Sequence, residues 1–338
     1  MRVFYSTTHW GHATAQANAD GHPIHSHEVP ARAEVLHQMV LAQRWPVRQP
    51  DDHGLDAILA VHDLAMVEYL RSAYGQMVAL DSRLPLKPPE AFAVRPVRHM
   101  PHSAFGKQGY YQFGDDNPIL AGTWAAAYWS AQTAISAAAH VVAMGETAYA
   151  LCRPPGHHAA HDMMGGYCYL NNVAIAARTL GPRVAILDID FHHGNGTQEI
   201  FYDTDVVLYC SLHGDPDIYY PYFWGGADET GAGEGDGANR NWPLPPGTGD
   251  AAFLRALNEA LDVIRDYQPR YLLVSAGFDA GAGDPLGGFN VTPAGFGEIG
   301  RRIAALGLPT VLVQEGGYRL ETLAENALSF LRAFEPTA

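Results

Sequence analysis

The chain has 338 residues, 47% of them hydrophobic, and a formal net charge of −15 at pH 7. This charge argues against nucleic acid as a direct partner, because phosphate contacts require lysine and arginine. It suits a cationic substrate. An acidic surface that only aids solubility is the commoner reason for such a charge. No apolar run reaches the ~20 residues of a membrane helix and the N-terminus has no apolar signal region, so we expect a cytoplasmic protein without a membrane partner.

Alternating strands and helices are predicted from residue 122 onward. Near-continuous apolar runs, typical of parallel strands covered on both faces, predict strands over 148–152, 183–188, 206–211, 270–276 and 309–314. Helical patterns cover 122–145, 169–180, 250–266, 293–306 and 319–333, the first with Thr123 as its cap and Gly145 as its stop. The alternation predicts one three-layer α/β domain over residues 1–338, a mostly parallel sheet flanked by helices.

Two long stretches do not fit this alternation. The stretch of about 81–121 holds several prolines and "GYYQFGDDNP", and that of about 213–247 holds "GGADETGAGEGDGANRNWPLPPG". Long loops in a compact domain are either functional or wrongly assigned. We interpret the second stretch as a surface loop that shapes a site.

Ionisable residues follow four of the predicted strands. The segments after these strands read "RPPGHHAAHDMMGGY", "DIDFHHGNG", "GFDAGAGDPLGG" and "EGGYRLE". Ligands of open α/β sheets bind outside the carboxyl ends of the strands. The sequence therefore predicts an active site at this edge of the sheet.

The segment "AILDIDFHHGNGT" supplies candidate metal ligands. Residues two apart in an extended chain face the same way, so Asp188, Asp190 and His192 share one side and His193 faces the other. Asp279, at the end of its own strand, is well placed as a third ligand to join Asp190 and His192. Two carboxylates and one imidazole with an open position indicate a catalytic metal, zinc first, although iron(II) and cobalt(II) accept the same ligands. The alternative for Asp190 and His192 is an ordinary hydrogen-bonded pair in a loop. The alternative for Asp279 is one of the aspartates that commonly follow a strand.

Three further groups fit acyl-bond hydrolysis. Asp188 can accept a hydrogen bond from an imidazole of the pair His157–His158 and raise its basicity. One such histidine can deprotonate water and later protonate the leaving amine. The hydroxyl of Tyr318 could face the developing oxyanion. The alternative for His157 and His158 is a structural role in the loop, and that for Tyr318 is a packed aromatic ring. Taken together, the residues indicate metal-assisted hydrolysis of an acyl bond.

Six motifs in order, "RPPGHH", "GGYCYLNN", "AILDIDFHHGNGT", "SLHGDP", "SAGFDAGAGDPLGG" and "QEGGY", resemble the zinc-dependent histone deacetylase family of the arginase/deacetylase superfamily. The resemblance spans nearly the whole chain. Within the family the chain is most similar to the bacterial acetylpolyamine amidohydrolase branch, through "HEVPARAEVL", "GKQGYY" and an inserted segment before "AGTW". The resemblance implies an arginase/deacetylase-like fold.

It also implies roles for matching residues. Asp190, His192 and Asp279 would bind one zinc ion per chain. His158 would be the general base and acid, with His157 as its electrostatic partner. Asn195 would be a neutral partner of His158, and the hydroxyl of Tyr318 would polarise the substrate carbonyl. Asp188 and Ser211 would bind a structural potassium ion, and Asp188 would also pair with His157.

The substrate-binding residues follow from the same resemblance. Tyr167 and Tyr220, with Gly166, would line a narrow tunnel, and Arg32 would line the acetate exit unless it is an ordinary helix-surface charge. The inserted segment of 81–121 would shape the entrance and form a homodimer contact. Asp115 and Asp116 would face the distal amines of the substrate, or else form a plain acidic turn.

The inserted segment departs from the family pattern in two places. Phe105 stands where the pattern has another acid, and Asp116 is shorter than the expected glutamate, so a short acetylated diamine fits more readily than a long polyamine. We therefore expect a zinc-dependent amidohydrolase that removes acetyl groups from small acetylated amines, with metal-bound water as the nucleophile. The alternatives are a protein or peptide acetyl-lysine deacetylase, a two-manganese ureohydrolase, and a non-catalytic binding protein.

Overall fold

The computed structural model describes residues 1–13, 26–93 and 97–335. In this part of the chain eight parallel strands form one sheet in the order β2-β1-β3-β8-β7-β4-β5-β6. The strands are β1 Arg2–Tyr5, β2 Val47–Arg48, β3 Ala148–Leu151, β4 Val184–Asp188, β5 Val207–Gly214, β6 Asn239–Leu244, β7 Tyr271–Ala276 and β8 Thr310–Gln314.

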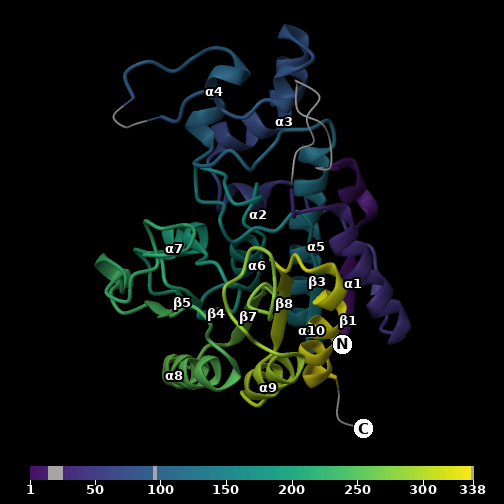
Figure 1. Ribbon diagram of the computed structural model, residues 1–338, viewed down its shortest axis with the longest axis vertical. Coiled ribbons are helices and arrows are strands. Elements are labelled where there is room, and N and C mark those ends of the chain that lie inside the picture. The colour runs from purple at the N-terminus through teal and green to yellow at the C-terminus, as the bar shows by residue number, and fades with distance from the viewer. Residues whose placement is uncertain (14–25, 94–96, 336–338) are drawn as a thin grey trace.

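Helices cover both faces of this sheet. They are α1 Pro30–Ala42, α2 Asp56–Leu59, α3 Leu64–Leu80, α4 Ala104–Tyr111, α5 Thr123–Met144, α6 Asn172–Leu180, α7 Asn195–Phe201, α8 Asp250–Tyr267, α9 Pro293–Ala304 and α10 Leu320–Leu331. Helices α3, α5 and α6 contribute to one apolar core, and α1, α8, α9 and α10 to the other. Figure 1 shows α3 and α4 at one end of the molecule and α8 and α9 at the other.

The strand sequences explain the two cores. Side chains alternate between the two faces of a strand. In β3, Ala148 and Ala150 face the core of α5 and α6, while Tyr149 and Leu151 face the core of α1 and α10. All four side chains are buried, which is why "AYAL" is apolar at every position.

Each of the five predicted strands and five predicted helices has a counterpart in the structure. Gly145 ends α5 as predicted, with φ +67 in the left-handed region. The prediction for Thr123 was wrong, because Gly122 is the N-cap. The Thr123 hydroxyl instead accepts a hydrogen bond from Leu120 N at 2.7 Å and contacts His12 Nδ1 at 2.9 Å.

The two stretches interpreted as loops both contain regular structure, so that assignment was wrong in part. Residues 81–121 include the 3-10 helix Leu84–Leu86 and α4, which begins after Ser103, whose hydroxyl accepts a hydrogen bond from Gly106 N at 3.0 Å. Residues 213–247 include the end of β5 and all of β6. The sequence of β6, "NRNWPL", is a polar edge strand with a proline, and it lacks the apolar pattern that marks the central strands.

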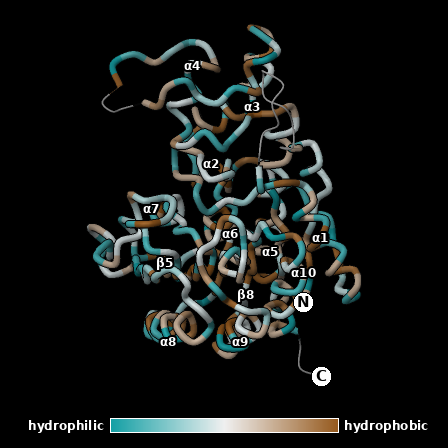
Figure 2. Tube along the Cα trace, in the orientation of Figure 1, coloured by the Kyte–Doolittle hydropathy of each residue, from teal (hydrophilic) through white to brown (hydrophobic). Residues whose placement is uncertain are grey.

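Helices α8 and α9 illustrate the polarity of the outer layer. In Figure 2 each carries polar and apolar residues along its length, as expected of a helix with one covered face. No helix in the described ranges is both long and apolar enough to cross a membrane.

Candidate metal centre and active site

The four strands followed by ionisable residues are neighbours in the sheet. The order β3-β8-β7-β4 places their carboxyl ends side by side, so the loops that follow them meet at one edge. These loops carry His157 and His158, Tyr318, Asp279, and Asp190 with His192. The predicted gathering of these side chains at the carboxyl edge is confirmed by the sheet order and by the contacts between them.

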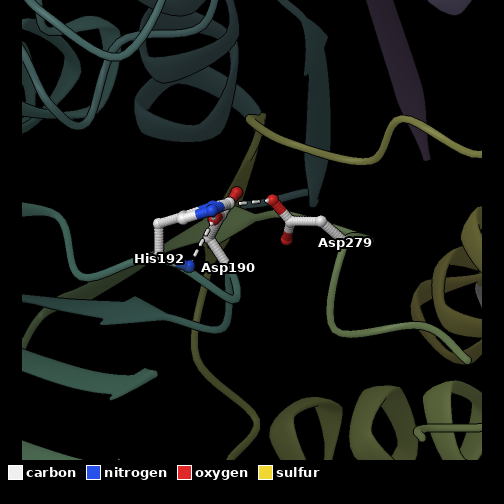
Figure 3. A group of neighbouring side chains, drawn as sticks. All are labelled: Asp190, His192 and Asp279. Carbon is white, nitrogen blue, oxygen red and sulfur yellow. Dashed lines mark hydrogen bonds and ion pairs between the residues drawn. The ribbon is translucent and has the colours of Figure 1, made fainter. Parts of the chain in front are cut away.

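Asp190, His192 and Asp279 form a group with metal-ligand geometry. One ligand atom from each lies within 4.8 Å of the others. The Nδ1 atom of His192 lies 3.1 Å from Asp279 Oδ2 and 3.3 Å from Asp190 Oδ1. Figure 3 shows the imidazole and both carboxylates converging on one point, with Asp279 coming from the loop after β7.

The backbone after β4 turns, which corrects the extended geometry predicted from sequence. Asp190 N donates to Asp188 Oδ1 at 3.1 Å, and His192 N donates to Asp190 Oδ1 at 2.9 Å. Phe191 N donates to Asp279 Oδ1 at 2.8 Å, which ties the two loops together. His193 is outside the group, as predicted; its buried ring lies beside that of His213, with centroids 4.6 Å apart.

The loop after β8 closes against the two carboxylates. Gly316 N donates to Asp190 Oδ2 at 2.7 Å. A Cβ atom on Gly316 would lie 2.2 Å from Asp279 Oδ2 and 2.5 Å from Asp190 Oδ2. Glycine is therefore required here, because any side chain would displace the carboxylates of Asp190 and Asp279.

The charges of this group suit a divalent cation. Burial, reinforced by the charge of Asp190, raises the pKa of Asp279 to about 7. For His192, burial favours the neutral ring, but the carboxylates of Asp190 and Asp279 outweigh it and raise its pKa to about 10. Two buried carboxylates with one imidazole on the same point form a donor set that zinc and similar cations accept.

The tandem histidines have opposite electrostatic surroundings. His157 Nδ1 lies 3.0 Å from Asp188 Oδ2; burial opposes its charge, but Asp190 and Asp188 raise its pKa to about 10. His158 Nδ1 lies 2.8 Å from Asn195 Oδ1. Burial, together with the charges of His157 and His192, holds the pKa of His158 well below its usual range. At neutral pH His158 is the neutral ring, which can accept a proton.

Tyr318 faces the same site and is fixed from two sides. Its backbone N donates to Asp284 Oδ2 at 2.7 Å, and the guanidinium of Arg32 lies 4.5 Å from its ring centroid. Burial raises the pKa of Tyr318 well above its usual value, against the opposing effect of Arg32, so the hydroxyl keeps its proton. A protonated hydroxyl is a hydrogen-bond donor for an oxyanion.

Arg32 is buried at 3% exposure, which excludes an ordinary helix-surface charge. Its Nε donates to Gly317 O at 2.6 Å, and its Nη2 donates to Glu315 O at 2.6 Å. Its Nη1 also pairs with Glu28 at 3.0 Å. Arg32 thus joins α1 to the loop that carries Tyr318.

Asp188 and Ser211 are paired across β4 and β5 in the sheet register. Asp188 Oδ2 accepts hydrogen bonds from both His157 Nδ1 and the hydroxyl of Tyr209, the latter at 3.1 Å. The hydroxyl of Ser211 lies 2.8 Å from His213 Nδ1. The two predicted potassium ligands are therefore adjacent, and Asp188 is the partner of His157.

A cavity of about 140 Å³ opens onto these groups. It is lined by Asp116, His158, Gly166, Tyr167, His192, Tyr220, Leu286 and Tyr318. A Cβ atom on Gly166 would lie 2.3 Å from the ring of His158, so this glycine allows the wall to approach the histidine. The ring of Tyr220 lies at right angles to that of His158, with centroids 5.0 Å apart.

The predicted rim residues do not all lie on this cavity. Asp116 does, and its Oδ1 accepts a hydrogen bond from Gly166 N at 3.2 Å, while burial raises its pKa to about 6. Tyr167 N donates to Asn117 Oδ1 at 3.0 Å. Asp115 is exposed and lies outside the catalytic cavity, on the wall of a neighbouring one. The end of the 81–121 segment therefore shapes the cavity wall through Asp116 and Asn117.

Two acids that support the site were missed at the level of sequence. Glu315 is fully buried, and its Oε2 accepts hydrogen bonds from Gly156 N at 2.7 Å and His157 N at 3.2 Å. Asp284 binds the backbone of Tyr318 and Arg319. The sequence held a signal for both acids, because each lies in a glycine-containing segment after a predicted strand. Glu315 precedes two glycines in "QEGGY", and Asp284 lies among glycines in "GAGDPLGG".

Comparisons with known proteins agree with this architecture. The histone deacetylase domain matches residues 22–334. An acetylpolyamine amidohydrolase of Burkholderia pseudomallei is 46% identical over 318 residues, covering 91% of each chain. Acetylpolyamine amidohydrolase 1 of Pseudomonas aeruginosa is 42% identical over 346 residues, covering 100% of each chain.

Solved structures show the same likeness. The crystal structure of an acetylpolyamine aminohydrolase from Burkholderia pseudomallei matches with a TM-score of 0.94 at 43% identity, covering 99% of this chain and 98% of that one. The HDA15 HD domain matches with a TM-score of 0.82 at 27% identity, covering 100% of this chain and 91% of that one.

Proposed function

This chain belongs to the histone deacetylase domain family, and from that premise we propose that it is a zinc-dependent amidohydrolase that removes acetyl groups from small acetylated amines. The observation that carries the proposal is the single narrow cavity on which His158, His192 and Tyr318 meet. These groups supply a base, a metal ligand and an oxyanion donor around one reacting carbon.

Asp190, His192 and Asp279 would hold the zinc ion, since their ligand atoms lie within 4.8 Å of one another. A zinc ion bound there supplies a Lewis acid for the amide carbonyl and lowers the pKa of water. The glycine at position 316 keeps the space between the two carboxylates open.

His158 is the proposed general base and acid. Its low pKa keeps it neutral before reaction, and Asn195 holds its Nδ1 without adding a charge. The ring can therefore accept a proton from the attacking water at Nε2 and donate it to the leaving amine. His157, protonated beside Asp188, provides a fixed positive charge next to the reacting groups.

Tyr318 is the proposed oxyanion donor. Its protonated hydroxyl reaches the cavity from the loop after β8, where Asp284 holds its backbone and Arg32 covers its ring. A donor fixed before the reaction stabilises the oxyanion without reorganisation in the transition state.

The choice of a small amine rests on the cavity and on the relatives. Tyr167 and Tyr220 leave a narrow passage, and Asp116 at its wall offers a carboxylate to a cationic chain. Two full-length relatives are named acetylpolyamine amidohydrolases.

The test is a substrate panel with metal content measured on the same sample. Acetate release is compared for N-acetylputrescine, N-acetylcadaverine, N-acetylspermidine and an acetyl-lysine peptide, before and after chelation and zinc return. We expect zinc-dependent release with higher kcat/KM for the free amines. A higher kcat/KM for the peptide would reassign the substrate, and full activity in chelated protein would overturn the metal mechanism.

Three further features are part of the proposal. We propose a structural potassium ion beside Asp188 and Ser211, a homodimer contact through residues 81–121, and a cytoplasmic location. The potassium site is tested by the dependence of thermal stability on potassium. The homodimer is tested by light scattering of the purified protein, and the location by cell fractionation.

A further inference from the structure

Glu28 is a buried carboxylate that binds two buried guanidinium groups and has no part in the reaction described above. It is 0% exposed, and Arg32 and Arg153 are each 3% exposed. Glu28 Oε1 accepts hydrogen bonds from Arg32 Nη1 at 3.0 Å and from Arg153 Nε at 2.8 Å. Without this carboxylate both guanidiniums would be buried charges that lack their counter-charge, so the position of each depends on Glu28.

Arg153 anchors Glu28 to the loop after β3. Its Nη2 donates to Glu28 Oε2 at 2.9 Å, so that Nε and Nη2 together bind both oxygens and restrict how the carboxylate can turn. The guanidinium is itself fixed from the N-terminal segment. Its Nη1 donates to His9 O at 2.8 Å, and its Nη2 donates to His12 O at 2.8 Å. The carboxylate of Glu28 is thus held in one orientation.

Arg32 carries this orientation to the loop of Tyr318. Its Nε donates to Gly317 O and its Nη2 donates to Glu315 O, both at 2.6 Å, while its guanidinium lies 4.5 Å from the centroid of the Tyr318 ring. A guanidinium is planar and rigid, so its nitrogens move together. A turn of Nη1, the nitrogen that Glu28 holds, would therefore shift both backbone contacts and the packing of the ring.

The charge of Glu28 is part of this arrangement. Burial opposes the charge, but Arg153 and Arg32 outweigh it and hold the pKa of the carboxyl below its usual value. A glutamine of the same size would leave two buried positive charges next to each other, and these would repel. Glu28 is thus the group that allows Arg32 and Arg153 to lie side by side.

We propose that Glu28 is a positioning residue for the reaction: by fixing the guanidinium of Arg32, it holds the hydroxyl of Tyr318 where the oxyanion forms. The inference rests on the proposed function, in which Tyr318 is the oxyanion donor. It makes the full rate depend on a carboxylate that does not line the catalytic cavity.

The experiment is a double-mutant cycle that measures kcat with the best amine substrate of the panel above. Glu28→Gln keeps the size of the side chain and removes its charge, and it is made in the wild type and in Tyr318→Phe. The matched control is Glu298→Gln. Glu298 on α9 also binds two arginines, Arg301 at 2.6 Å and Arg302 at 2.7 Å, but its side chain is 32% exposed.

We expect Glu28→Gln to lower kcat about tenfold in the wild type, with KM and zinc content unchanged within about twofold. In Tyr318→Phe, which has no hydroxyl to place, the same substitution should lower kcat by less than about twofold. A substitution that only loosens the fold would lower kcat by the same factor in both proteins. Glu298→Gln should leave kcat unchanged in both.

Chemical rescue gives a second readout. Glu28→Ala leaves a space between the two guanidiniums that suits a formate ion in size and charge. Formate should raise kcat of Glu28→Ala by about fivefold or more, with a dependence on concentration that saturates. Chloride at the same ionic strength should not, and neither the wild type nor Glu298→Ala should respond to formate.

Equal losses of kcat in the wild type and in Tyr318→Phe would overturn the inference while the proposed function stands, because Glu28 would then act on the fold alone. An undiminished kcat in Glu28→Gln, or no rescue of folded Glu28→Ala, would overturn it as well. If the wild type releases acetate from none of the amides, the proposed function fails and the inference fails with it. Glu28→Asp, which keeps the charge, replaces Glu28→Gln in the cycle if that variant does not fold.

Discussion

The metal-facing residues and the rim residues of the same cavity are held in place by different means. Asp190 and Asp279 are 0% exposed and are bound by backbone N–H groups of loops that follow neighbouring strands. At the rim, Asp116 lies on the cavity wall and accepts a hydrogen bond from Gly166 N, while Asp115 next to it is exposed and outside the cavity. Loops at the ends of neighbouring strands fix the first set, while hydrogen bonds between two longer loops position the second.

Because of this difference, substitutions in the two regions should have different effects on activity. A change at the strand ends removes the metal or the base and lowers the rate for every substrate. A change at the rim alters which substrate is preferred and leaves the chemistry intact. The five predictions below bear on this separation and run from the largest expected effect to the smallest.

The largest effect is expected for His192→Ala. Loss of the imidazole leaves two facing carboxylates, so zinc content and acetate release should both fall, the latter by about a thousandfold or more. Elemental analysis and an acetate assay measure the two quantities. His53→Ala, an exposed histidine near Ser136, is the matched control and should change neither. Full activity in metal-free His192→Ala protein would contradict the metal site.

Tyr318→Phe should lower kcat by about a hundredfold to a thousandfold, because one oxyanion donor is lost. Zinc content should be unchanged, since Tyr318 is not a proposed ligand. The decrease should be similar for all acetylated amines in the panel. A decrease confined to one substrate would instead make Tyr318 part of the rim.

Glu315 tests whether a supporting acid acts through the histidine loop. Glu315→Ala leaves the N–H groups of Gly156 and His157 without their acceptor and should lower kcat by about tenfold. Glu315→Gln keeps an acceptor oxygen and should recover most of this loss. Equal losses in both variants would show that an acceptor oxygen at this position does not restore the rate, and would contradict a role through these two hydrogen bonds.

The same residue gives a pH dependence in chelated protein. Burial raises the pKa of Glu315 from 4.5 to about 8, so the folded protein holds a proton that the unfolded chain releases in this interval. Folding stability of the wild type should therefore fall as the pH rises from about 4.5 to about 8. Glu315→Gln lacks this contribution, and thermal unfolding of the two proteins across that interval measures the difference.

The smallest effect is expected for Asp115→Asn. The side chain is exposed and outside the catalytic cavity, so kcat for N-acetylpentylamine should stay within about twofold. KM for N-acetylcadaverine should rise by about threefold, because one carboxylate that is proposed to face the distal amine of the substrate is lost. A large decrease in kcat would remove the distinction between the two regions.

The same distinction explains how much could be predicted from sequence. The central strands β3, β4, β7 and β8 are apolar at almost every position, so their ends, and the residues just after them, were located correctly. The strand β2 has two residues, too few for any pattern. Helix α3, with Asp63 as its N-cap, carried a readable signal that the sequence interpretation did not use.

The geometry after β4 was beyond sequence reasoning for a different reason. The grouping of Asp190 with His192 was right, but the argument from an extended chain was not, because side-chain oxygens of Asp188 and Asp190 turn the backbone. Glu315 was missed because a buried acid that binds only backbone N–H groups has no periodic pattern. Its role depends on a contact with Gly156, 159 residues away in the chain.

The position of β8 has a consequence for how the protein is made. It is the last strand in the described chain, yet it lies between β3 and β7 in the interior of the sheet. Until it is synthesised, the two halves of the sheet share no strand, and one partner of Arg32, the carbonyl of Gly317 285 residues away, does not exist. The active site therefore assembles only after β8 and the loop that follows it have been synthesised, and until then the growing chain presents an unfilled sheet edge that a chaperone can bind.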